Sequence, residues 1–279
     1  MHYQSDAVEL DLGMGAILMR IALGIEYDGS PYHGWQTQTQ GRTVQDTLQV
    51  AIAKVALHPI EVVGAGRTDS GVHAMMQVAH FDTQTERPMD AWVRGVNSYL
   101  PDSIRILWAH PVDDHFHARF SAHARHYQFL LLNRRVNSAV RAQKVSWFHL
   151  PLDLMAMQQG IKYFLGEHDF SAFRASECQA ASPVRQMQRA ELQQFGDYFL
   201  FSFSANGFLH HQVRNMVGAL VYVGKGNLAP TDIQQLLLQK DRKLAPPTFP
   251  GDGLYLTGVS YAQEWNLPAS ISNISLLIA

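Results

Sequence analysis

The segment GAGRTDSGVHA, residues 64–74, concentrates chemically active side chains on a glycine-rich stretch of chain. It contains the guanidinium of Arg67, the carboxylate of Asp69, the hydroxyl of Ser70 and the imidazole of His73. A cation within a few ångströms favours the ionised form of an aspartate and lowers its pKa. Because an ionised carboxylate can attack glycosidic or phosphoryl centres, we expect Asp69 to be a nucleophile that Arg67 keeps ionised. The structural alternative is that Arg67 and Asp69 form an ion pair that only holds the turn.

Other glycine-rich or nucleophilic motifs do not fit this segment. Asp69 stands where a dinucleotide fingerprint has its third glycine, the P-loop sequence GKS or GKT is absent, and Ser70 lacks the flanking glycines of a nucleophile elbow. A metal-dependent phosphoesterase stays open as an alternative. It would require Asp69 and His73 to converge with His168 and Asp169 of a distant segment.

The distribution of charge predicts a basic surface on a nearly neutral protein. The 279 residues carry a net charge of −2 and are enough for one large domain or two ordinary ones. Residues 115–152 and 198–231 contain no Asp or Glu. We expect these windows to bind a polyanion on one face, the alternative being solvated loops that lack acids. Their cations are Arg119, Arg125, Arg134, Arg135, Arg141, Lys144, Arg214 and Lys225, together with seven histidines that include His210 and His211.

Cysteine usage and hydropathy indicate a cytoplasmic protein without a membrane span. Cys178 is the only cysteine, which excludes an internal disulfide and a cysteine-rich zinc site. Residues 1–16 contain three acids and lack the basic start of a signal peptide. No apolar run approaches the ~18 residues that cross a bilayer.

The opening segment must be positioned by strands and helices, and the first part of the chain predicts them in the order β-α-β-β-α-β. This order is the split βαβ pattern of ferredoxin-like folds. Apolar runs predict strands, and helical spacing of apolar residues, with Thr43 and Asp46 as an N-terminal cap, predicts helices. The strands are expected at residues 17–29, 60–66, 75–83 and 103–112, and the helices at 43–57 and 89–100.

The second part of the chain repeats the plan. Strands are expected at residues 124–132, 185–195, 197–206 and 253–263, and helices at 152–166, 210–224 and 231–239. We therefore predict an α/β (α+β) protein with two ferredoxin-like halves, residues 17–118 and 119–265, between an extension, 1–16, and a tail, 266–279. Their sheets should lie side by side as one continuous mixed or antiparallel sheet, with a basic cleft at the centre.

Six ordered blocks show a specific resemblance. They are IEYDGSPYHGWQTQ (25–38), GAGRTDSGVHAMMQVAHF (64–81), FHARFSAHARHYQF (116–129), LGEHDFSAFRASECQA (165–180), FLHHQVRNMVG (208–218) and GLYLTGVSY (253–261). On these blocks the chain resembles the TruA-type tRNA pseudouridine synthases. The resemblance implies an isomerase that cuts the N1–C1′ bond of a uridine, turns the base and rejoins it through C5. It also implies action at positions 38, 39 and 40 of the tRNA anticodon stem-loop by a homodimer, with no metal and no cofactor.

The resemblance assigns roles to five residues. Asp69 matches the nucleophile, and Tyr127 the residue that stacks on the flipped-out base and moves the C5 proton. Arg67 matches the residue that pairs with the aspartate and replaces the extruded base. Arg214 matches the arginine beside the aspartate, and Leu254 the apolar side of the pocket. A catalytically silent RNA-binding module is the rival that keeps the same surface without the reaction.

Weaker expectations concern the walls of the site. His168 is expected to shape the cleft, and Arg125 and Arg174 are expected to contact substrate phosphates, as are Arg119 and Arg185. The chain also departs from the family pattern. Gln212 stands where methionine is usual, Ser70 where alanine is common, and PPTFPGDG (246–253) replaces a stretch that is commonly alanine-rich. The first and third departures are expected to alter the pocket without removing a catalytic group.

Overall fold

The computed structural model describes residues 18–268 and 271–274. The first half has the predicted order of elements, and its bounds are β1 (Met19–Tyr27), α1 (Val44–Ala56), β2 (Val63–Gly64), β3 (His73–Thr83), α2 (Met89–Asn97) and β4 (Ile104–Val112). Helix α1 begins as predicted, because the side chain of Thr43 accepts a hydrogen bond from Asp46 N. Strand β2 is shorter than predicted, since Val62 N donates to the side chain of Gln49 instead of to a neighbouring strand.

The second half contains the predicted hairpin and helices, with two further short strands. Its elements are β5 (Ala122–Asn133), β6 (Ser146–Phe148), α3 (Leu154–Gly160), β7 (Gly166–Asp169), β8 (Val184–Phe195), β9 (Tyr198–Ala205), α4 (Gln212–Gly224), α5 (Asp232–Gln239) and β10 (Leu254–Tyr261). The predicted helix 152–166 ends early. Its α-helical part stops at Gly160, a poor helix former, and continues as a 3-10 turn over Ile161–Phe164.

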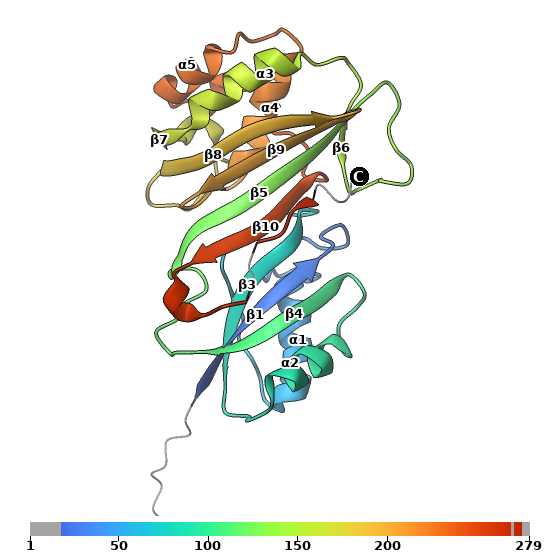
Figure 1. The fold of residues 1–279 in the computed structure, drawn as a ribbon, viewed down its shortest axis with the longest axis vertical. Helices are drawn as coiled ribbons and strands as arrows, with labels where there is room; N and C mark the ends of the chain where they lie inside the picture. Colours follow the sequence, from blue (N-terminus) through green and yellow to red (C-terminus); the bar gives the residue numbers. More distant parts are fainter. Residues whose placement is uncertain (1–17, 269–270, 275–279) are drawn as a thin grey trace, which may run out of the picture.

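All ten strands belong to one mixed sheet along the long axis of the described molecule (Figure 1). The order of eight strands is β4-β1-β3-β10-β5-β9-β8-β7, while β2 pairs with β3 and β6 with β5. The continuous mixed sheet is therefore confirmed. The two parts of the sheet join where β10 lies between β3 and β5. The β10–β3 pair is parallel and the β10–β5 pair antiparallel.

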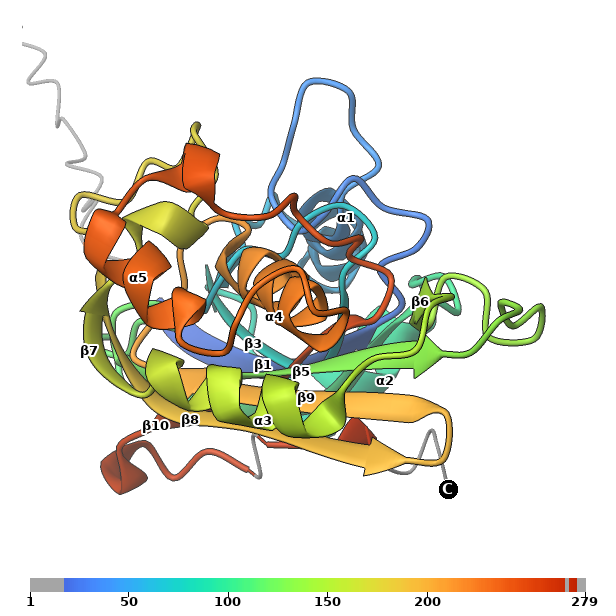
Figure 2. The same cartoon turned by 90° about the horizontal axis from the view of Figure 1, so that it is seen from above.

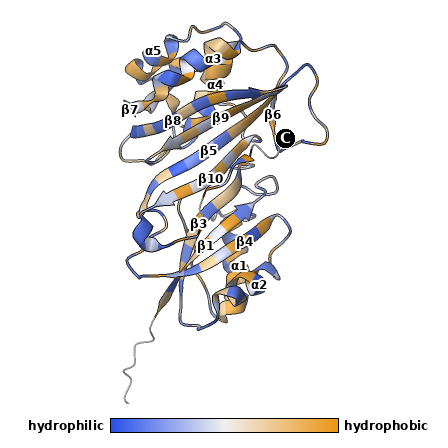
Figure 3. Cartoon of the chain, in the orientation of Figure 1, coloured by the Kyte–Doolittle hydropathy of each residue, from blue (hydrophilic) through white to orange (hydrophobic). Residues whose placement is uncertain are grey.

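Helices α1, α4 and α5 lie on one side of the sheet (Figure 2). The main apolar core fills the space between helices and sheet, and a smaller cluster covers part of the other face. Strand β10 shows the alternation: Leu254 and Leu256 belong to the main core, and Tyr255 belongs to the cluster on the other face. Strand β8 lies near the edge of the sheet, and most of its residues are exposed and hydrophilic (Figure 3). Within the described residues, no helix is long and apolar enough to cross a membrane.

Candidate active site

Asp69 lies on the loop between β2 and β3, and its side chain is 19% exposed. The loop is held by backbone hydrogen bonds to a neighbouring segment, because Trp35 N donates to Thr68 O at 3.0 Å. The hydroxyl of Ser70 adds a bond to Tyr32 O at 3.2 Å, which an alanine at this position would lack. The predicted nucleophile therefore stands on a loop of fixed conformation.

Gly34 is the reason that the two segments can approach so closely. Its φ is +89°, a left-handed conformation that favours glycine, and a Cβ placed there would lie 2.5 Å from Thr68 O. The backbone of Thr68, the residue before Asp69, therefore packs directly against the backbone of Gly34.

Arg214 brings the second half of the chain to Asp69. It lies in the first turn of α4, and its Nη1 donates to Asp69 Oδ2 at 3.0 Å. Its Nε donates to Phe249 O at 2.9 Å, so the guanidinium is fixed from both sides. The stretch 246–250, which departs from the family pattern, therefore supports the arginine. Gly218, one turn further along α4, lets this stretch pack closely, because a Cβ there would lie 2.4 Å from Pro247 O.

Two histidines complete the surroundings of the carboxylate. His210 Nε2 lies 3.4 Å from Asp69 Oδ1, and His211 Nε2 lies 3.5 Å from Oδ2. Burial raises the pKa of Asp69, but the contact with His210 and the charges of His211 and Arg214 outweigh it and hold the pKa below its usual value. In return, Asp69 raises the pKa of His210. The carboxylate is therefore ionised at neutral pH, as a nucleophile must be.

The ion pair expected between Arg67 and Asp69 is not formed. Arg67 is exposed, and its Nε donates to Gln36 Oε1 at 3.0 Å. No ion pair of Arg67 lies within 4.0 Å among the residues that the structure describes. The expectation that Arg67 keeps Asp69 ionised is wrong for this conformation, because the amide of Gln36 holds the guanidinium and residues of the other half hold the carboxylate.

His210 and His211 are partners of Asp69 that the sequence does not predict, although they precede Arg214 in HHQVRN and lie in an acid-free window. His211 occupies the N-cap of α4 with a φ of 62°. This left-handed backbone turns the chain so that His210, His211 and Arg214 all reach the same carboxylate.

Tyr127 and Leu254 lie on adjacent strands, β5 and β10. In the register of β5 and β10, Tyr127 pairs with Leu256 and Phe129 with Leu254. Tyr127 is 8% exposed, and its ring meets Phe208 edge-on at 5.0 Å. Burial raises the pKa of its hydroxyl, and Asp69 is close enough to raise it further. The phenol therefore keeps its proton at neutral pH.

The two arginines expected to contact phosphate, Arg125 and Arg174, differ in their contacts. The guanidinium of Arg125 is held by hydrogen bonds within the protein. It donates to the backbone carbonyls of Ala65, Arg119, Ala122 and Asn206. These bonds engage both terminal nitrogens of Arg125 and oppose the predicted contact with a phosphate. Arg174 follows a 3-10 turn, is partly exposed and has no hydrogen bond or ion pair within the described ranges. It remains a candidate for phosphate binding.

His168 does not join the site. It lies on β7, at the far edge of the sheet from β3, and its Nε2 contacts Leu165 O at 2.7 Å. His73 is also engaged elsewhere, since Gly29 N donates to its Nδ1 at 3.1 Å and its Nε2 contacts Gln143 O at 2.9 Å. Within the described residues, no metal-binding group contains His73, His168 or Asp169. The metal-dependent phosphoesterase alternative therefore lacks its site.

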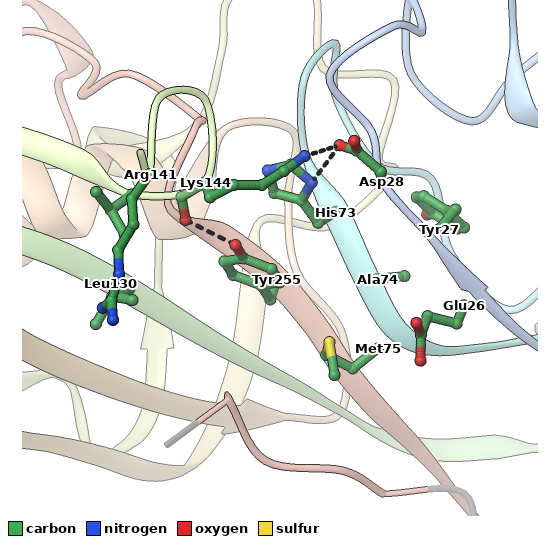
Figure 4. A pocket seen from close by; sticks show the side chains of 11 residues that line it. Glu26, Tyr27, Asp28, His73, Ala74, Met75, Leu130, Arg141, Lys144 and Tyr255 are labelled. Carbon is green, nitrogen blue, oxygen red and sulfur yellow. Dashed lines mark hydrogen bonds and ion pairs between the residues drawn. The ribbon is translucent and has the colours of Figure 1, made fainter. Parts of the chain in front are cut away.

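His73 instead belongs to a cavity of about 390 Å³ (Figure 4). Its polar wall contains Asp28, which contacts both His73 and Lys144, and its apolar wall includes Met75 and Tyr255. Tyr255 lies on the opposite face of β10 from Leu254, so this cavity is separate from the Asp69 cluster. The contacts join the two halves of the chain without taking part in the candidate site.

Gln212 does not face the arginine, contrary to the expectation that it alters the pocket. Its side chain is buried, accepts a hydrogen bond from Leu209 N at 2.8 Å and contacts Met216 Sδ at 3.8 Å. It closes the turn that leads into α4.

Comparison with known proteins decides the family. A family model described as tRNA pseudouridine synthase matches residues 24–121 and 161–262, which is more than half of the chain. The chain belongs to the tRNA pseudouridine synthase family. The matched ranges of this pseudouridine synthase contain Asp69, Arg214 and Leu254, while Tyr127 lies between them. The enzyme is therefore an isomerase, as the resemblance implied.

Relatives of this pseudouridine synthase match over nearly the whole chain. A tRNA pseudouridine synthase A of Methylobacillus flagellatus is 56% identical over 261 residues, which cover 94% of this chain and 100% of that protein. A tRNA pseudouridine synthase A of Dechloromonas aromatica is 58% identical over 250 residues, which cover 90% of this chain and 95% of that protein. The solved structure of the archaeal box H/ACA sRNP Nop10–Cbf5 complex aligns with a TM-score of 0.35 and 14% identity, over 72% of this chain and 44% of that chain.

Proposed function

We propose that this enzyme converts uridine to pseudouridine at positions 38, 39 and 40 of the tRNA anticodon stem-loop, with Asp69 as the nucleophile. The observation that carries the proposal is the geometry of Asp69. Its carboxylate is mostly buried, yet it remains ionised between Arg214 and two histidines and lies beside Tyr127. The three positions in tRNA come from the family resemblance.

The reaction needs no net change of atoms or electrons. The N1–C1′ bond of the uridine breaks, the base turns, a C5–C1′ bond forms, the proton on C5 leaves and N1 gains a proton. A carboxylate contributes by adding to C1′, by adding to C6 or by assisting formation of a glycal, and each of these roles requires its ionised form. Arg214, fixed by Phe249 O, keeps Asp69 ionised and in place during this sequence.

The target uridine must leave its stack before Asp69 can reach its sugar. Flipping a base costs a few kcal/mol, which stacking and insertion of side chains offset. Tyr127 supplies an aromatic surface beside the carboxylate. Arg67 is exposed, and among the described residues its side chain bonds only to Gln36, so it can give up this bond and fill the space that the base leaves. Leu254 forms the apolar side of the pocket.

Binding of the rest of the tRNA is assigned to basic side chains and to a second subunit. Arg174 has no partner within the described part of the chain and is proposed to bind a phosphate. By resemblance to the family, we propose a homodimer in which one tRNA bridges both subunits. The enzyme is proposed to act in the cytoplasm, where its substrate tRNA is found.

Asp69→Asn tests the nucleophile. The full chain is incubated with tRNA that lacks pseudouridine, without metal or cofactor, and modified positions are mapped. We expect pseudouridine at positions 38–40 with the unmodified enzyme and none with Asp69→Asn, while tRNA binding is largely retained. Asp252→Asn, an exposed carboxylate on a neighbouring segment, is the matched control and should remain active. Unchanged product with Asp69→Asn would refute the proposed role. Absence of product with the unmodified enzyme would favour a silent RNA-binding module.

A further inference from the structure

A group of three potential metal ligands lies at the candidate site. It consists of Asp69, His210 and His211. One ligand atom of each residue lies within 4.8 Å of the others. Asp69 belongs to the first half of the chain, and the histidines belong to the turn before α4 in the second half. These are different histidines from those of the phosphoesterase alternative, and they contact the carboxylate directly.

Two of the separations equal those between neighbouring ligands of a tetrahedral metal ion. Zn²⁺ binds histidine nitrogen and carboxylate oxygen at roughly 2.0–2.2 Å, which places neighbouring tetrahedral ligands about 3.3–3.5 Å apart. The observed separations are 3.4 Å from Asp69 Oδ1 to His210 Nε2 and 3.5 Å from Asp69 Oδ2 to His211 Nε2. Because the two distances end on different oxygens of the carboxylate, side-chain rotation is needed to bring one atom of each residue onto a single ion.

His210 has a further carboxylate on its other ring nitrogen. Glu177 Oε1 lies 3.9 Å from His210 Nδ1. This distance is longer than a hydrogen bond. If Glu177 moves closer when a metal binds, its carboxylate would hold a proton on Nδ1 and leave the Nε2 lone pair for the metal, as is common in zinc sites. The side chains of His210 and His211 are 38% and 24% exposed, so an ion can reach them from solvent.

We propose that Asp69, His210 and His211 form an inhibitory site for a divalent transition metal of the Zn²⁺ type. Two imidazoles and one carboxylate favour Zn²⁺ or Co²⁺ over the oxygen-binding ions Mg²⁺ and Ca²⁺. The ion withdraws the carboxylate from the ribose, so that the enzyme is inactive until the metal is removed. Metal binding stands on the geometry alone, whereas inhibition rests on the proposed function of Asp69.

Arg214 opposes the metal and limits its affinity. Its Nη1 lies 3.0 Å from Asp69 Oδ2, so a bound cation would stand close to a permanent positive charge. This opposition makes the site weaker than a structural zinc site and makes the inhibition reversible. Removal of Arg214 should therefore tighten metal binding, whereas removal of a ligand should weaken it.

Cobalt absorption tests the site without turnover. The full chain without a polyhistidine tag, and with Cys178→Ser to remove the thiol, is titrated with Co²⁺ and followed by its visible absorption. We expect one bound ion with the intense spectrum of tetrahedral Co²⁺, displaced by Zn²⁺. His210→Gln and His211→Gln should each weaken binding more than about 100-fold, and Glu177→Gln about tenfold. Arg214→Gln should tighten it at least about tenfold.

The matched control is His115→Gln. His115, Asp113 and Asp114 form another candidate group, but all three residues are exposed. Binding that survives both His210→Gln and His211→Gln, or that is lost with His115→Gln, would overturn the proposal.

Activity then separates the two proposals. Zn²⁺ should abolish pseudouridine formation by the unmodified enzyme, and excess EDTA should restore it. Co²⁺ binding at the site with full activity retained would refute inhibition. Absence of product even after EDTA, with normal Co²⁺ spectra, would instead refute the proposed function while leaving the metal site intact.

Discussion

Arg214 Nη1 lies 3.0 Å from Asp69 Oδ2, although 145 positions separate the two residues in the chain. The contact crosses from a loop of the first half to the first turn of a helix in the second half. Neither half alone therefore contains both the carboxylate and the cation that fixes it. The site is a property of the joined sheet.

Arg214→Gln should lower kcat and move the pH dependence. Arg214 contributes to the lowered pKa of Asp69, so its removal raises that pKa. Because the proposed function requires the ionised carboxylate, we expect activity to be lost as pH falls through this pKa, and the acid limb of the kcat–pH profile to move to higher pH. We expect kcat to fall about 100-fold. Arg189→Gln, which removes an exposed arginine paired with Glu191 at 2.7 Å, is the control and should change neither quantity.

Gly34→Ala should displace the loop that carries Asp69. The added methyl group would lie 2.5 Å from Thr68 O, at a φ of +89° that L residues rarely adopt. We expect the free energy of unfolding to fall by about 1–3 kcal/mol and kcat to fall with it. Gly41→Ala provides the comparison, since Gly41 has a φ of +64° and no atom within 4 Å of an added Cβ. It should cost about 1 kcal/mol and leave kcat unchanged. Equal effects on kcat would show that the close approach is unimportant.

Arg125 and Arg174 should respond in opposite ways to substitution by methionine. Arg125→Met leaves four backbone carbonyls without their donor, so the free energy of unfolding should fall by about 1–3 kcal/mol. Arg174→Met should leave stability unchanged but reduce the salt dependence of tRNA binding by about one unit of slope. Chemical unfolding and binding at several salt concentrations measure both. A reduced slope for a fully folded Arg125→Met would restore its predicted phosphate contact.

Asp28 should make stability depend on pH in the acid range. Partial burial raises the pKa of Asp28, but the contacts with Lys144 and Ser30 outweigh this effect. The pKa therefore falls from its usual value of 3.8 to about 2. A carboxyl group with a lowered folded-state pKa stabilises the protein above its unfolded pKa, and this contribution is lost as pH falls from about 4 to about 2. We expect Asp28→Asn to reduce the free energy of unfolding at pH 7 by about 0.5–1 kcal/mol, because the side chain is partly exposed.

Urea unfolding of Asp28→Asn should therefore approach that of the unmodified protein as the pH falls from about 4 to about 2. A double-mutant cycle with Lys144→Met identifies the partner. In the Lys144→Met background, Asp28→Asn should have a much smaller effect. A difference that grows as the pH falls would contradict the assignment.

The periodicity of apolar residues predicts the long helices and strands that pack against one core. Helices α1 and α4 and the hairpin of β8 and β9 lie close to their predicted ranges, since a regular apolar face and clear turns define them. Strands β6 and β7 were missed, because three or four residues are too few for a pattern and form strands only by pairing with β5 and β8. Helix 152–166 was predicted too long, because its apolar spacing continues past Gly160.

The candidate site was predicted in its residues but not in all its contacts. Asp69 contacts Arg214, and Tyr127 is close enough to Asp69 for the carboxylate to affect its pKa, whereas His168 lies on the far edge strand. The Arg67–Asp69 contact fails for a physical reason: residues two positions apart in a glycine-rich loop can point in different directions, as Arg67 and Asp69 do. His210 and His211 could not be assigned to Asp69, because their approach depends on a left-handed residue before α4 and on the register of β10 between β3 and β5.

The position of β10 has a consequence for how the protein is made. This strand joins the two parts of the sheet, yet it comes after every other strand of the sheet in sequence. During synthesis, β3 and β5 emerge from the ribosome long before the strand that must separate them. A chain that ends before residue 254 would lack the strand that pairs with both β3 and β5. We therefore expect such a truncated chain to fail to hold Asp69 against Arg214.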